Sequence, residues 1–144
     1  MSRLKTPPIQ LLSRDGAHLR FLEVPNLAAP DLPDTILTDV EVLTPDRLVR
    51  YLGREVSRDF FTNLEQALLD GARLDYPEKT VPTVQDDRSG LAITYLESTP
   101  ESVVIQVLIR EMVTPSIPDI EDTAFEVSRV SLIDAAQVIR EEWR

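Results

Sequence analysis

The stretch LAITYLESTPESVVIQVLIREM, residues 91–112, decides the fold class of this chain. Segments 91–97 and 103–112 are rich in β-branched and aromatic residues, and apolar side chains recur at every second position of the later segment, as on one face of a strand. The connection between them, residues 98–101, is short and polar. The pattern therefore predicts two adjacent antiparallel strands joined by a turn.

The residues that follow extend this sheet and then become helical. Segment 123–130, TAFEVSRV, alternates between two sets of side chains and predicts a third strand of the same meander. Ser131 has the side chain of a helix N-cap, and Asp134 completes an approximate capping box. The final helix carries one apolar stripe that we expect to face the sheet, formed by Leu132, Ala136, Ile139 and Trp143.

The amino-terminal half also has strand patterns. Segments 9–12 and 17–24 flank Arg14-Asp15-Gly16, whose glycine is free to take a positive φ, and they predict a hairpin. Segment 36–43, ILTDVEVL, predicts another strand, and segment 47–54 is interpreted as one more. The pattern of segment 47–54 does not decide which of its faces is buried.

A helix from about residue 58 to residue 70 interrupts the strands. Ser57 predicts its N-cap, and Asp59 lies near the positive end of the helix dipole. Gly71 lies where a left-handed C-cap belongs, so we expect it to end the helix. The apolar residues follow at helical spacing and are Phe60, Phe61, Leu64, Ala67 and Leu68.

The order of elements is strands, a helix, three strands and a helix. This order predicts a single α+β domain at residues 9–144, with an antiparallel sheet of about five to six strands and two helices on one face. We expect residues 1–8, which include Pro7 and Pro8, to form a loose tail. No internal repeat and no low-complexity segment is apparent.

Composition excludes several classes of function. The 144 residues include 25 acidic and 15 basic ones, a formal net charge of −10, so we expect no nucleic-acid partner and no anionic membrane partner. The chain has no cysteine and one histidine, which excludes thiol chemistry and multi-histidine metal sites. Neither a glycine-rich phosphate loop nor another catalytic motif is present. We therefore expect a protein without enzymatic activity, cofactor or bound metal.

The single histidine and the amino terminus add two further expectations. His18 lies in a strand pattern beside Arg20; as a general base it would need a partner carboxylate, and a structural or surface role is favoured. The amino terminus has no apolar run of the signal-peptide type, and no stretch approaches the about 18 apolar residues of a membrane span. These features favour the cytoplasm.

The first candidate partner-binding site is an acidic segment near the carboxyl terminus. Asp119, Glu121 and Asp122 follow two prolines, and no base lies between Arg110 and Arg129. Three carboxylates in four residues could hold a calcium or magnesium ion, but their spacing matches no EF-hand loop. A solvated loop and a partner-facing loop are the two remaining interpretations.

The second candidate site surrounds the central connection. Asp86, Asp87 and Tyr76 combine carboxylates with an aromatic anchor, as expected of a surface that meets a cationic partner. The alternative is an ordinary solvated connection between the helix and the hairpin.

The chain resembles a group of small bacterial domains. The residues concerned are Asp59-Phe60-Phe61, Leu64, Leu68 and Gly71, then the apolar hairpin, then Val130-Ser131-Leu132 with Ala135-Ala136. This pattern of element order and apolar positions, over residues 36–143, resembles small acidic immunity-type domains of polymorphic and contact-dependent toxin systems and related uncharacterised actinobacterial domains. The resemblance implies a cytoplasmic protein that occludes the active site of a toxin. It carries over no individual site residue.

Several functions remain open. An immunity protein fits the net charge of −10, because an acidic inhibitor is steered toward a basic toxin. An accessory or structural assembly protein, such as a phage-tail or secretion-apparatus component, is the main alternative, and a nucleic-acid mimic is another. The sequence does not identify the protein partner, and it leaves the oligomeric state open.

Overall fold

The structure, a computed structural model, describes residues 6–24, 34–45, 48–73, 83–86, 89–114 and 117–143. For residues 83, 97, 110–114, 117–123 and 125 it describes the backbone. Tyr76 and Asp87, two of the candidate partner-binding residues, lie outside the described residues.

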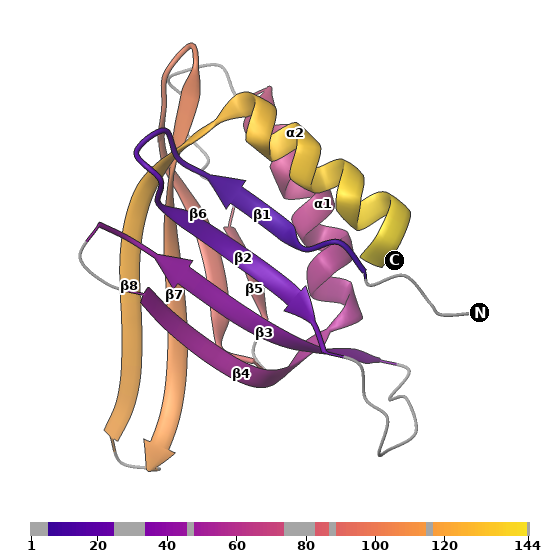
Figure 1. Ribbon diagram of the computed structural model, residues 1–144, viewed down its shortest axis with the longest axis vertical. Coiled ribbons are helices and arrows are strands. Elements are labelled where there is room, and N and C mark those ends of the chain that lie inside the picture. Colours follow the sequence, from indigo (N-terminus) through magenta and orange to yellow (C-terminus); the bar gives the residue numbers. More distant parts are fainter. Residues whose placement is uncertain are drawn as a thin grey trace.

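The described strands form two antiparallel sheets of four strands each, ordered β1-β2-β3-β4 and β5-β6-β7-β8 (Figure 1). The α+β class is therefore confirmed, whereas the expectation of a single sheet is wrong. The first sheet consists of β1 Ile9–Leu12, β2 His18–Glu23, β3 Thr35–Leu43 and β4 Leu48–Ser57. The second consists of β5 Thr83–Asp86, β6 Leu91–Ser98, β7 Ser102–Thr114 and β8 Ile117–Ser128.

The two sheets separate at helix α1, Arg58–Ala72, which follows β4 directly. The sequence pattern did not predict strand β5. This strand completes the second sheet by pairing with β6. It has four residues, Thr-Val-Gln-Asp, of which Val84 alone is aliphatic. Such a segment has too few apolar positions to show an alternation.

The two helices pack against each other and close one side of the molecule (Figure 1). Helix α2, Arg129–Val138, continues as one π-helical segment, Ile139–Trp143. Helix α2 lies against β1, and α1 lies against β5. The predicted apolar stripe of the last helix is confirmed, because all four of its residues are buried: Leu132, Ala136, Ile139 and Trp143.

Aromatic rings form the centre of the core between the helices and the first sheet. Phe21 of β2 meets Phe60 and Phe61 of α1 edge-on, with ring centroids 6.1 and 5.9 Å apart. The centroid of Phe61 is also 4.9 Å from that of Trp143, whose Nε1–H donates to the carbonyl of Pro7 at 2.9 Å. This last bond ties Pro7, which lies in the segment expected to be a loose tail, to the last helix.

Both helix starts differ in detail from the sequence prediction. Ser57 occupies the N-cap position of α1, but its side chain makes no capping bond. The N-cap of α2 is Ser128, whose side chain accepts from the amide of Ser131 at 3.1 Å; the prediction of Ser131 as the cap is wrong. Two serines three positions apart each satisfy the sequence rule, and β8 ends at the earlier one.

Gly71 does not end the first helix. The helix continues to Ala72, and Arg73, with φ −104°, takes the C-cap position. Gly71 is buried instead under the ring of Tyr95. The glycine is therefore required for a close contact between α1 and β6, not for a left-handed turn.

The order of elements repeats. Four antiparallel strands followed by a helix occur at residues 9–72 and again at residues 83–143. The sequence analysis found no internal repeat, and this expectation is wrong at the level of topology.

Candidate partner-binding surface

The longest hairpin of the described residues is formed by β7 and β8, which have 13 and 12 residues. They pair from Ser102 opposite Ser128 to Thr114 opposite Ile117. The far ends of β7 and β8 extend beyond the other strands and away from α2 (Figure 1). Because β8 is an edge strand of its sheet, its outer backbone groups can pair with another chain.

The acidic segment lies in this edge strand and not in a loop, which corrects the sequence interpretation. Asp119 is opposite Glu111, Glu121 is opposite Ile109, and Asp122 is opposite Leu108. The preceding Pro118 favoured a loop, but an edge strand tolerates proline because half of its backbone donors need no ladder partner. The structure thus brings the three predicted acids together on the backbone of one protruding strand.

The pairing of Glu111 with Asp119 places two acidic residues directly opposite each other on neighbouring strands. The backbone of the hairpin thus places a fourth acidic residue beside the three of β8.

Asp86 has a different environment from that expected. Its side chain is buried, with 8% of the residue exposed, and it accepts bonds from the Ser89 amide at 3.1 Å and the Ser89 hydroxyl at 2.5 Å. The amide of Ser57 donates to the same oxygen at 3.4 Å. Burial alone would raise the pKa of Asp86, but these bonds from Ser89 and Ser57 hold it below its usual value. Asp86 therefore links β5 to the start of α1, and the expectation that it is exposed is wrong.

A cluster of polar contacts around the buried Glu41 on the first sheet was not anticipated. Glu41, 7% exposed, accepts from Arg50 Nε at 2.8 Å. Its other carboxylate oxygen lies 2.7 Å from His18 Nε2 and 3.4 Å from Arg20 Nη1. Glu41 is the partner carboxylate that His18 lacked in the sequence, and it comes from the neighbouring strand β3.

The contacts of Glu41 determine what this cluster can do. Burial raises the pKa of Glu41, but hydrogen bonds from His18 and Arg50 and the charges of Arg50 and Arg20 together hold it below its usual value. Both oxygens are occupied by donors from β2 and β4. The arrangement thus joins three strands of the sheet, and a carboxylate held ionised in this way is a poor proton acceptor.

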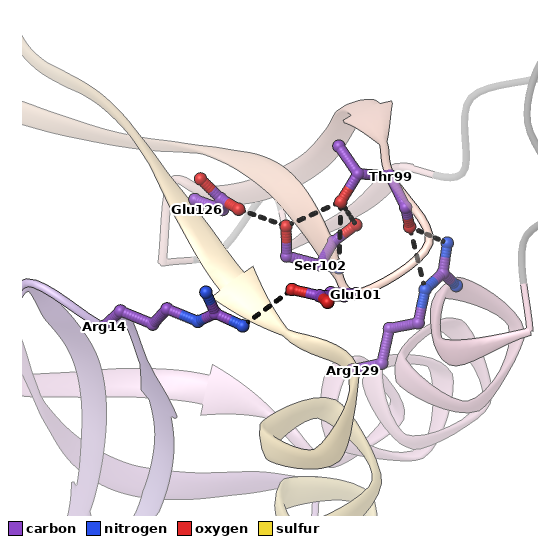
Figure 2. Close-up of polar contacts among 6 residues, drawn as sticks. All are labelled: Arg14, Thr99, Glu101, Ser102, Glu126 and Arg129. Atoms are coloured by element: carbon purple, nitrogen blue, oxygen red, sulfur yellow. Dashed lines mark hydrogen bonds and ion pairs between the residues drawn. The ribbon is translucent and has the colours of Figure 1, made fainter.

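The base of the long hairpin is fixed by polar contacts (Figure 2). The Ser102 hydroxyl donates to the Glu126 carboxylate, and Arg129 donates to the carbonyl of Thr99 at 2.7 Å. A second nitrogen of Arg129 donates to the carbonyls of Gly71 and Ala72 at 3.1 and 2.9 Å. Glu126 is therefore engaged within the chain, and the candidate surface begins beyond it, toward the tip of the hairpin.

An exposed ion pair joins the same region to the first sheet. Arg14, in the turn after β1, lies 2.8 Å from Glu101, in the turn before β7 (Figure 2). Both side chains are largely exposed, so water screens the pair and its contribution to stability is small.

Comparison of the chain with protein-family models, curated proteins and solved structures finds no significant match. Within the part of the chain that the structure describes, no helix is long and apolar enough to cross a membrane.

Proposed function

We propose that this chain is a non-catalytic binding protein of the immunity type, which acts in the cytoplasm and neutralises a basic toxin by covering its surface. The observation that carries the proposal is the position of Asp119, Glu121 and Asp122 on the protruding edge strand β8. The far ends of β7 and β8 lie away from the helices (Figure 1), so a partner can approach them without displacing the core.

Charge supports the same proposal. The net charge of −10 attracts a basic protein over a distance of about 8–10 Å at physiological ionic strength. The acids concentrated on β8 then orient the encounter, because charges at the rim of an interface act mainly on the association rate.

An assembly protein is the second candidate, and the edge of the first sheet favours it. The edge strand β4 carries Leu48 and Leu52, which are 49% and 72% exposed. Large apolar side chains on a free sheet edge are suited to pairing with another chain. In that case the contact would be apolar and nearly independent of salt.

Association kinetics distinguish the two candidates. The partner is first captured with the tagged protein from a lysate of the native organism and identified by mass spectrometry. Its binding is then measured by surface plasmon resonance at low and moderate salt. We expect the triple variant Asp119→Lys, Glu121→Lys and Asp122→Lys to associate at least about tenfold more slowly at low salt and to lose most of its salt dependence.

The matched control places the same charge change elsewhere. Asp134, Glu141 and Glu142 are exposed acids of the last helix, and their replacement by lysine changes the net charge equally. If the association rate falls equally in both variants, the net charge of the protein matters and the position of the acids on β8 does not. A loss of binding in Leu48→Ser and Leu52→Ser, with the triple variant unaffected, would favour the assembly protein.

A further inference from the structure

The two halves of the chain share sequence as well as topology. The tetrapeptide Glu55-Val56-Ser57-Arg58 recurs unchanged as Glu126-Val127-Ser128-Arg129. The first copy spans the junction of β4 with α1, and the second spans the junction of β8 with α2. An identical sequence at the equivalent junction in each half relates the two halves residue by residue.

Further matches follow in chain order. Phe21-Leu22-Glu23 at the end of β2 corresponds to Tyr95-Leu96-Glu97 in β6. Thr44-Pro45 after β3 corresponds to Thr114-Pro115 at the end of β7. The halves differ in length in the connections, where insertions are tolerated, and also in the strands, since β7 and β8 have 13 and 12 residues and β3 and β4 have 9 and 10.

The turns between the first two strands of each half also correspond. Gly16 precedes β2 and Gly90 precedes β6. The two glycines are as far apart in the sequence as Phe21 and Tyr95. Both glycines have a positive φ, 93° and 77°. An equivalent backbone requirement, met by glycine in both halves, indicates that the turns are copies of one turn.

One backbone hydrogen bond is repeated as well. The amide of Arg58 donates to the carbonyl of Asp34 at 2.9 Å, and the amide of Arg129 donates to the carbonyl of Glu101 at 3.2 Å. Each bond ties the first residue of a helix to the residue just before the third strand of its half. The equivalence therefore extends to internal contacts.

The contacts between the halves are reciprocal. Strand β1 of the first half packs on α2 of the second, and β5 of the second half packs on α1 of the first. At one seam the amide of Leu12 donates to the Ser131 hydroxyl at 3.0 Å; at the other the amide of Ser57 donates to Asp86 at 3.4 Å. Reciprocal use of the same elements is the property of an interface with two-fold symmetry.

We infer that the chain consists of two copies of one ββββα unit, joined head to tail, which form an approximately two-fold symmetric dimer within a single polypeptide. Each copy places its first strand on the helix of the other. The two-copy architecture does not rest on the proposed function.

The copies differ in charge at the hairpin that precedes each helix. The segment 44–58 of the first copy contains Arg47, Arg50 and Arg54, whereas the equivalent segment 114–129 of the second contains Asp119, Glu121 and Asp122. The acidic surface is therefore a specialisation of the second copy. This last step rests on the proposed function, because it takes the acids as partner contacts.

The two-fold relation makes a geometric prediction about the termini. Ten residues, 73–82, connect the end of α1 at Ala72 to β5. If Arg144 were joined directly to Met1, nine residues, 144 and 1–8, would connect Trp143 to β1. The Trp143 indole already donates to the carbonyl of Pro7, and the two described ends of the chain lie close together (Figure 1). Because this joint would be only one residue shorter than its counterpart, we expect that no added linker is needed.

A circular permutant tests the inference. Residues 79–144 are followed directly by residues 1–78, so that the two copies exchange their order. The two-copy architecture predicts that this permutant keeps the oligomeric state, the near-ultraviolet circular dichroism of Trp143 and the urea midpoint of the natural order. The control permutant has the same joint but opens the chain between Thr99 and Pro100, inside the second copy, and we expect it to unfold at a lower urea concentration.

Two outcomes would overturn the inference. The exchanged permutant would lack the signal of Trp143, or it would unfold at a urea concentration no higher than that of the control. A second version has ten glycine and serine residues inserted at the joint. It distinguishes a joint that is too short from an exchanged order that cannot fold. If only this lengthened version folds, the spacing required by the two-fold relation is wrong.

Discussion

A Cβ atom on Gly71 would lie 2.6 Å from Cζ of Tyr95, closer than such atoms approach. The Tyr95 hydroxyl donates to the carbonyl of Ala67 at 2.9 Å, so the ring crosses one turn of α1 in a fixed position. Burial, together with the charge of Asp70, raises the pKa of this hydroxyl, which therefore stays protonated as a donor. The pair joins the helix of the first half to β6 of the second.

This contact predicts the effect of Gly71→Ala. In an ordinary helix interior the change stabilises by about 1 kcal/mol. Here we expect it to destabilise by about 1–3 kcal/mol, because the methyl group overlaps a buried ring. The measurement is urea unfolding, with Gly71→Ala repeated in a Tyr95→Leu background. If Gly71→Ala is equally harmful there, the ring is not the cause.

Trp143 is the second test of packing. It is 3% exposed, and its ring contacts Phe61. We expect Trp143→Ala to lower the free energy of unfolding by about 3–5 kcal/mol. Trp143→Phe should lose less, since it removes mainly the indole donor to Pro7. The wild-type fluorescence should be blue-shifted and poorly quenched by iodide; a red-shifted, freely quenched spectrum would contradict the burial.

Glu41 predicts a dependence of stability on pH. Its pKa is held below the usual value in the folded state, so the unfolded state binds the proton more readily. The stabilisation is present above about pH 4.3, the ordinary pKa of glutamate, and is lost as the pH falls through the lower folded value. Glu41→Gln should cost about 1–3 kcal/mol at neutral pH and flatten this acid limb. If the free energy of unfolding of the variant falls as steeply with decreasing pH as that of the wild type, other groups cause the fall.

Asp86 separates stability from binding. Replacement by alanine removes the acceptor of the Ser89 and Ser57 amides and should cost about 1–3 kcal/mol. Because the side chain is buried, the association rate with a captured partner should stay unchanged. A slower association with unchanged stability would indicate that Asp86 contacts the partner.

The sequence was informative wherever alternation or helical spacing extended over several residues. The strands β6 and β7 and the stripe ending in Trp143 follow directly from their apolar periodicity. It failed where local signals were weak or had two explanations. Strand β5 is too short and polar to alternate, and Pro118 favoured a loop because edge-strand status depends on the sheet order.

The ionic cluster shows a second limit. His18 and Glu41 meet because β2 pairs with β3 in a register that places Arg20 opposite Glu41. No short spacing in the sequence signals that pairing. The repeat was not predicted for a related reason. Its matches are short and are interrupted by connections of unequal length, so they are recognised only when the equivalent elements are known.

One comparison shows directly whether the acids of β8 contact a basic protein. Tagged wild-type protein, the triple lysine variant at Asp119, Glu121 and Asp122, and the control variant at Asp134, Glu141 and Glu142 are used for capture from a lysate of the native organism. Quantitative mass spectrometry then compares the captured proteins. We expect a basic protein that is bound to the wild type and the control and is at least tenfold depleted on the triple variant, about the size of a steering effect. Equal capture by the triple variant and the wild type would contradict it.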